Sequence, residues 1–141
     1  MSIKEIQDEI IDEFSFFGDW MEKYEYIIDL GKSLPQIDEQ YKNEDHIIKG
    51  CQSRVWLHAA PAGDQVHFTA DSDAIITKGL IALLVRVLSD QKAGDIAEAD
   101  LYFIDKIGLK EHLSPTRSNG LVSMVKQMKL YGLAIQAKNA N

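Results

Sequence analysis

The residues best suited to chemistry are Gly50-Cys51-Gln52-Ser53, a run that contains the only cysteine of the chain. A thiolate is a strong nucleophile, and the neighbouring cations Lys49 and Arg54 would lower the pKa of the thiol toward neutrality. Gly50 allows the positive φ of a sharp turn just before the sulfur. Because free cysteine also packs as a small buried hydrophobe, the spacing alone leaves a reactive thiol and a packing residue as alternatives.

A second polar cluster spans residues 113–120, where Ser114-Pro115 has the pattern of a helix start. Arg117 would lie in the first turn of that helix, where a cation opposes the helix dipole. Such an electropositive spot suits an anion or a partner's carboxylate, and a plain surface charge is the alternative. The run Asp71-Ser72-Asp73 is interpreted most simply as a helix cap.

The histidines and the remaining sequence patterns give little indication of chemistry. His46, His58, His67 and His112 have no metal-ligand spacing, and His58 and His67 point outward on predicted strands. The chain has no Walker-type loop and no GxGxxG, HExxH, GxSxG or CxxC sequence. A single cysteine excludes an intrachain disulfide and a multi-cysteine metal or iron–sulfur site. We therefore expect no metal site.

Length and charge limit the possible classes of protein. The chain has 141 residues, 45% of them hydrophobic, which predicts one folded domain over residues 1–141 rather than disorder. Its net charge of −7 argues against nucleic acid and against anionic membrane surfaces as partners. The N-terminus lacks a secretory signal and no apolar stretch reaches the ~20 residues of a membrane span, so we expect a cytoplasmic protein.

The elements that must position these residues begin with two amphipathic helices. Ser2 and Glu5 have the spacing of a capping box, and apolar residues follow at intervals of three and four until Gly18. Asp19 begins a second helix, which Gly31 is placed to end.

The middle of the chain predicts a β-hairpin. Apolar and polar residues alternate over 54–59 and 65–70, on either side of turn residues at 61–64. An irregular loop is expected over 32–45, and a strand over 46–49 is weakly indicated.

The second half of the chain predicts mainly helices. A helix capped by Asp71 or Ser72 and ending near Leu88 is apolar nearly all round, so we expect it to be the central core element. Short helical turns between residues 93 and 107 precede a last helix that begins at Pro115. This order predicts an α+β fold, with helices packed around a small antiparallel sheet.

Two blocks of sequence, GCQSRVW within Ile48–Leu57 and LSPTRSNGL over Leu113–Leu121, carry a resemblance to a known family. Leu34-Pro35, Phe68–Asp73 and Lys78-Gly79-Leu80 add to it. The chain resembles the SufE/CsdE family of sulfur acceptors, which work with cysteine desulfurases in iron–sulfur cluster assembly. The resemblance extends from about residue 10 to about residue 130. It departs from the family in one loop, where the stretch between Leu34-Pro35 and Lys49 is acidic.

The resemblance implies a SufE/IscU-like fold and a role for each residue of the site. Cys51 would take sulfur as a persulfide from a SufS-type cysteine desulfurase, stimulate that enzyme, and pass the sulfur to a SufBCD-type scaffold. Gly50, Gln52, Ser53, Asp73 and Arg117 would support the loop or bind the partner. The chain would need no cofactor of its own, because pyridoxal phosphate belongs to the desulfurase. It would act as a persulfide carrier and desulfurase activator rather than as a stand-alone enzyme.

Two alternatives follow from the same cysteine. Cys51 could serve a hydrolase or a thiol peroxidase, which would require a histidine within hydrogen-bond reach of the sulfur. The chain could instead be a binding module in which Cys51 only packs.

Overall fold

The structure, a computed structural model, describes residues 1–140. Within them the chain forms seven α-helices, two 3-10 helices and a three-stranded sheet. The α-helices are α1 (Ile3–Phe14), α2 (Trp20–Lys32), α3 (Ile75–Leu88), α4 (Ala93–Glu98), α5 (Phe103–Lys106), α6 (Leu109–His112) and α7 (Pro115–Asn139). The 3-10 helices are η1 (Glu39–Tyr41) and η2 (Glu44–His46), and the strands are β1 (Val55–Ala62), β2 (Gln65–Ser72) and β3 (Gln91–Lys92).

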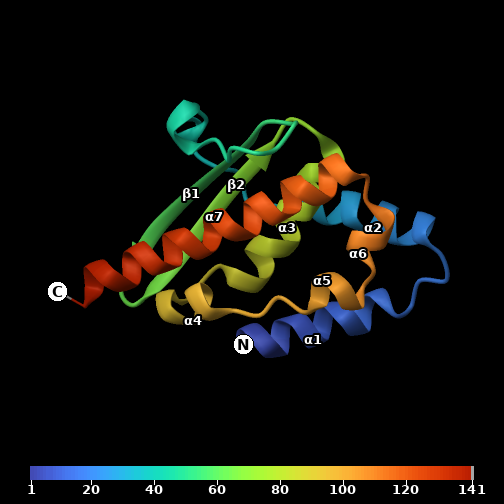
Figure 1. Cartoon of the computed structure of the whole chain (residues 1–141), viewed down its shortest axis with the longest axis horizontal. Helices are drawn as coiled ribbons and strands as arrows, with labels where there is room; N and C mark the ends of the chain where they lie inside the picture. Colours follow the sequence, from blue (N-terminus) through green and yellow to red (C-terminus); the bar gives the residue numbers. More distant parts are fainter. Residues whose placement is uncertain (141) are drawn as a thin grey trace.

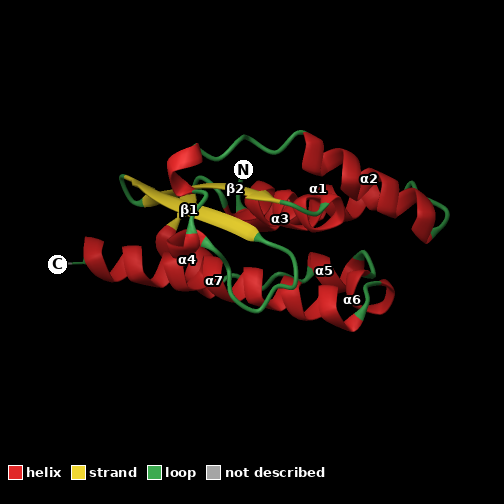
Figure 2. Cartoon of the chain, turned by 90° about the horizontal axis from the view of Figure 1, so that it is seen from above, coloured by secondary structure: helices red, strands yellow, loops and turns green. Residues whose placement is uncertain are grey.

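The predicted α+β class is confirmed. Strands β1 and β2 form an antiparallel hairpin in which Val55 pairs with Ser72 and Ala62 with Gln65. The two-residue strand β3, which the sequence did not indicate, adds to the free edge of β2. Helix α7 runs the length of the molecule beside α3 and α4, as Figure 1 shows, and in the view of Figure 2 it lies on the opposite side of the molecule from α2. No helix among residues 1–140 combines the length and the hydrophobicity needed to cross a membrane.

Helix α3 is the central core element, as its sequence predicts. Its side chains are buried on several sides, including Leu80, Ile81, Leu84 and Leu88, each at most 1% exposed. A helix surrounded in this way gains most of its stability from the hydrophobic contacts of its neighbours.

The predicted N-terminal caps of α1, α2 and α7 are confirmed. Ser2 and Glu5 form the capping box, and the side chain of Asp19 accepts a hydrogen bond from the backbone of Glu22. Ser114 likewise caps α7 through the N–H of Arg117. The prediction that Gly31 ends α2 was wrong, because the helix continues to Lys32.

The expected capping of α3 was also wrong. Strand β2 continues to Ser72, and α3 begins after Ala74, which provides no side-chain cap. Asp71 instead forms ion pairs with Lys42 at 2.9 Å and Lys78 at 3.3 Å. Asp71 therefore connects the end of β2 to Lys42 in the preceding loop and to Lys78 in α3.

The segment before the hairpin also differs from the prediction. The loop expected over 32–45 contains η1 and the start of η2, and no strand forms over 46–49. An isolated bridge between Ile47 and Trp56 is the β-pairing that segment makes within the described chain.

Gly31 and Gly79 have a packing role. A Cβ at Gly31 would lie 2.8 Å from the backbone nitrogen of Gly79, and a Cβ at Gly79 would collide with the carbonyl oxygen of Ile27. The two glycines therefore allow the backbones of α2 and α3 to approach closely.

We predict that Gly79→Ala lowers the free energy of unfolding by about 1–2 kcal/mol. Alanine gains roughly 1 kcal/mol in helix propensity, but forcing the two backbones apart costs about 2–3 kcal/mol. Urea unfolding measures the change. Gly18→Ala is the matched control, since a Cβ there meets no atom within 4 Å, and its effect should stay within about 0.5 kcal/mol. Equal stability of the two variants would contradict the close approach.

Candidate functional site

The loop that carries Cys51 has a closed base. The N–H of Ile48 donates to the carbonyl of Val55 at 2.8 Å, and the Ile47–Trp56 bridge lies just outside it. Residues 49–54 therefore form a short tip projecting from the start of β1. The tip turns at Gly50, whose φ of 94° favours glycine and where a Cβ would collide with the hydroxyl of Ser123.

Cys51, which belongs to this loop, is partly buried against the first turns of α7. Its sulfur is 3.5 Å from the carbonyl oxygen of Gly120, to which the thiol donates. A small cavity of about 110 Å³ adjoins it. The cavity is lined by Cys51, Gln52, Ser53, Thr77, Leu80, Thr116, Arg117, Gly120 and Met124. This set is called the sulfur pocket below.

Burial in the sulfur pocket makes the Cys51 thiol a weaker acid than an ordinary cysteine. Burial raises the pKa of the Cys51 thiol above its ordinary value. The prediction that Lys49 and Arg54 lower this pKa is wrong for this conformation: Lys49 lines a different hollow, beside Glu44, and both cations are exposed to water, which screens their charge. The thiol is therefore harder to deprotonate than that of an ordinary exposed cysteine.

Asp73 secures the exit of the loop. Its carboxylate accepts the backbone N–H of Arg54 at 3.0 Å, and its own N–H donates to the carbonyl of Arg54 at 3.2 Å. The hydroxyl of Ser72 donates to the same carbonyl at 2.8 Å. Every polar backbone group of Arg54 is thus bound by the end of β2 and the residue after it, which fixes the direction in which the loop enters β1.

Arg117 lies on the opposite wall of the sulfur pocket. Its guanidinium donates to the hydroxyl of Tyr24 at 3.1 Å, and its backbone N–H donates to the Ser114 hydroxyl at 3.3 Å. The side chain is exposed, so its charge faces both the pocket and the solvent. The sequence clusters around Cys51 and Arg117 therefore meet at one place.

Several pocket residues were not singled out from the sequence. Thr77 and Met124 are examples, because each looks like an ordinary helical residue. Tyr24, which bonds Arg117 from outside the pocket, was not singled out either. The spacing of Thr116, Gly120 and Met124 places them on one face of α7, and this was the signal that could have found Met124.

The four histidines are engaged elsewhere. The ring of His58 stacks on Tyr41, and His67 contacts Asp90 at 2.8 Å. His46 contacts Asn43, and His112 stacks on Trp20.

Among the residues that the structure describes, no histidine lines the sulfur pocket. No group of three or more metal-ligating side chains occurs in residues 1–140 either. The arrangement offers a thiol with a backbone acceptor beside it and a cation at the rim. It can carry out attack by the sulfur once the thiol loses its proton, without an adjacent side-chain base.

Comparison with known proteins identifies the family. The SufE family, described as an Fe-S metabolism associated domain, matches residues 8–132. An uncharacterized SufE-like protein of Rhizobium etli is 44% identical over 127 residues, covering 86% of each chain. A second one, from Rhizobium meliloti, is 41% identical over 127 residues, covering 86% of this chain and 91% of its own. The chain belongs to the SufE family, which places it in iron–sulfur metabolism.

A solved structure confirms the fold independently. The solution structure of a hypothetical protein from Thermus thermophilus has a TM-score of 0.77 to this chain. The likeness covers 94% of this chain and 96% of the other at 17% identity. At that identity it concerns the fold alone.

We predict that Cys51 reacts slowly at neutral pH. Burial raises the thiol pKa, so the thiolate forms only above the range of an ordinary cysteine. Alkylation by iodoacetamide, followed by mass spectrometry, should rise with pH to a midpoint above that of the same chain unfolded in urea. A midpoint equal to or below the unfolded one would contradict the burial argument.

We also predict that Asp73→Ala speeds this alkylation. Losing the acceptor for the Arg54 N–H loosens the loop and lets water reach the sulfur. The pKa of the thiol then falls toward its ordinary value, so the thiolate fraction at neutral pH and the alkylation rate both rise. Asp73→Asn is the matched control, because its side-chain oxygen still accepts the hydrogen bond and the rate should stay near that of the wild type. Equal rates in the alanine and asparagine variants would show that this bond does not hold the loop.

Proposed function

We propose that this protein accepts sulfur as a persulfide on Cys51 from a cysteine desulfurase of the SufS type and delivers it to an iron–sulfur scaffold of the SufBCD type. The observation that carries the proposal is the placement of the single cysteine. In a chain that belongs to a family of iron–sulfur metabolism, this cysteine lies at the tip of a surface loop, beside a small pocket.

The transfer step is an exchange at sulfur. The Cys51 thiolate attacks the outer sulfur of the desulfurase persulfide and forms a new S–S bond. The S–S bond within the desulfurase breaks, and its electron pair leaves on the enzyme's cysteine, which takes up a proton. Sulfur moves without net oxidation, so the step needs no cofactor in this chain; pyridoxal phosphate acts on the desulfurase. The rate depends on the thiolate fraction and on access to the sulfur.

The resting geometry supports a carrier that is activated by docking. Burial raises the pKa of the thiol, so a free carrier would react poorly with stray oxidants and electrophiles. The base of the loop is held by Ile48–Val55 and by Asp73, which leaves the tip over 49–53 as the part that must move. A partner that draws the tip into its own active site would free the sulfur.

The residues around the thiol have separate roles in this proposal. Gly50 provides the turn that aims Cys51, and exposed Gln52 and partly exposed Ser53 form the part of the loop that a partner meets first. Arg117 presents its guanidinium at the rim of the pocket, where it is available to a carboxylate of the partner. Asp73 keeps the loop in register with the sheet.

The presence of a single thiol favours a carrier over other thiol chemistries. A second nearby cysteine would attack the persulfide and release the sulfur as sulfide, whereas Cys51 can hold it until an acceptor arrives. A hydrolase or a thiol peroxidase requires a histidine close to the sulfur, and the sulfur pocket of the described chain provides none. These alternatives therefore have no support from the geometry.

We predict that incubation with a SufS-type desulfurase and cysteine adds the mass of one sulfur atom to the wild-type chain. Intact-mass spectrometry before and after reduction is the measurement. Cys51→Ser should gain no mass and should fail to raise the turnover of the desulfurase.

The control for folding is the circular dichroism of Cys51→Ser, which should match that of the wild type. An equal gain of sulfur in the serine variant, or none in the wild type with an active desulfurase, would overturn the proposal. Full stimulation of the desulfurase by Cys51→Ser would favour the binding module instead.

A further inference from the structure

Helix α7 carries a second apolar face that the core does not cover. Its buried residues include Leu121, Met124 and Met128, yet Val122, Leu130 and Leu133 are 56%, 47% and 54% exposed. A groove of about 640 Å³ lies along this second face. Its apolar lining includes Leu101, Ile104, Leu121, Val122, Leu130 and Leu133. We call it the α7 groove.

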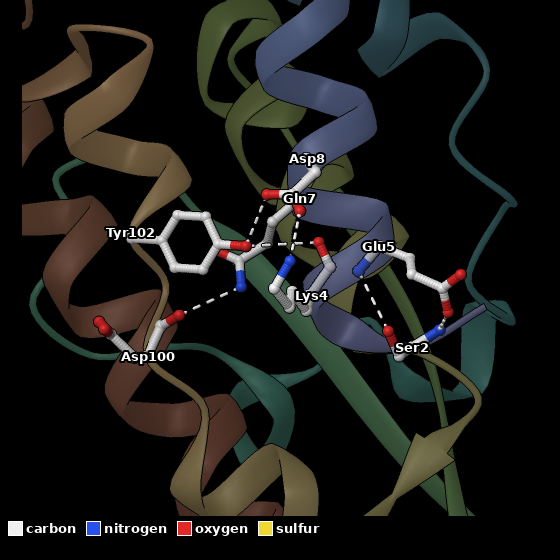
Figure 3. Close-up of polar contacts among 7 residues, drawn as sticks. All are labelled: Ser2, Lys4, Glu5, Gln7, Asp8, Asp100 and Tyr102. Atoms are coloured by element: carbon white, nitrogen blue, oxygen red, sulfur yellow. Dashed lines mark hydrogen bonds and ion pairs between the residues drawn. The ribbon is translucent and has the colours of Figure 1, made fainter.

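The wall of the groove opposite α7 is held in place by hydrogen bonds to α1, drawn in Figure 3. The buried side chain of Gln7 donates to the carbonyl of Asp100 at 3.1 Å and accepts the N–H of Phe103 at 3.2 Å. The hydroxyl of Tyr102 donates to Asp8 at 2.7 Å. The groove is therefore preformed rather than opened by a ligand.

The charge of α7 differs from that of the rest of the chain. The helix has four basic residues and no acidic residue, although the chain as a whole has 15 basic and 22 acidic residues. Lys126 and Lys129 line the α7 side of the groove, and the ion pairs of residues 1–140 do not include them. The opposite side has Asp100 and the pair Asp105–Lys110, whose atoms are 3.5 Å apart.

We propose that the α7 groove binds an amphipathic helix of a partner protein. The apolar stripe of that helix would pack on Val122, Leu130 and Leu133, and its acidic side chains would face Lys126 and Lys129. An amphipathic helix in a hydrophobic groove is a common mode of protein recognition, and complementary charge selects the partner and its orientation.

The charges disfavour two other occupants. A second copy that contributed its own α7 would set Lys126 and Lys129 against the same lysines, with no acid on either helix to balance them. A flat membrane surface does not fill a concave groove, and a chain of net charge −7 is repelled by anionic lipids.

The α7 groove and the sulfur pocket use different residues of the same helix. The groove is lined by Ser118, Leu121, Val122 and Val125 of this helix, whereas the pocket is lined by Thr116, Arg117, Gly120 and Met124. The two sites therefore lie side by side on the first turns of α7 without sharing a lining residue.

The test uses the full chain labelled with ¹⁵N and a synthetic peptide of about 15 residues, a helix of about 22 Å, with leucines on one face and glutamates beside them. We expect amide shifts concentrated at Leu101, Val122 and Leu133. Leu133→Glu should weaken binding about tenfold or more, a typical loss for a central apolar contact. Phe16→Glu is the matched control, because Phe16 is 80% exposed and outside the groove, and it should bind as the wild type does.

A charge exchange provides the second arm. Lys126→Glu with Lys129→Glu should weaken the glutamate peptide and strengthen a version with lysines in place of glutamates. Alkylation of Cys51 should be unchanged in all groove variants. Shifts outside the groove, or equal binding of the two peptides by the wild type, would overturn the proposal.

Two further outcomes would assign the groove to another occupant and also overturn it. One is binding to phosphatidylserine vesicles that Leu133→Glu abolishes. The other is a sedimentation coefficient that falls from dimer to monomer in the same variant.

Discussion

The hydrogen bond between the Cys51 thiol and the carbonyl of Gly120 is the interaction on which the arrangement of the site depends. It joins a loop before β1 to the second turn of α7, two segments 69 residues apart in sequence. The contact does not require glycine at position 120, because a Cβ there would lie 3.5 Å from the sulfur, an ordinary van der Waals distance. The long packing of α7 on α3 and α4 keeps this surface in place.

Burial of the Cys51 thiol protects the sulfur but lowers its reactivity. Burial in the sulfur pocket raises the pKa of the thiol, so less of it is thiolate at neutral pH in the isolated protein. For a proposed carrier this is useful, because reactivity then depends on the partner. In that proposal Asp73 and the Ile48–Val55 bond would confine the opening movement to the few residues between them.

Helix α7 combines two surfaces with different chemistry. One face of its first turns forms a wall of the sulfur pocket, and another face, from Ser118 to Leu133, is apolar and basic and lines the α7 groove. Apolar residues on opposite faces explain why its sequence shows no single amphipathic stripe. A helix of this kind is positioned by the core on one side and is available to partners on the other.

The sequence by itself determined the fold class, the N-terminal caps of α1, α2 and α7, the hairpin, the buried α3 and the two motif blocks, because these depend on local spacing and on residue type. Only the tertiary structure decided that Gly31 allows the close packing of two helices instead of ending α2. It also decided that Asp71 pairs with two lysines instead of capping α3. The raised pKa of Cys51 was also beyond the sequence. The flanking cations predicted a lowered pKa. The pKa is raised instead because the thiol is buried against α7, a contact between residues distant in the chain.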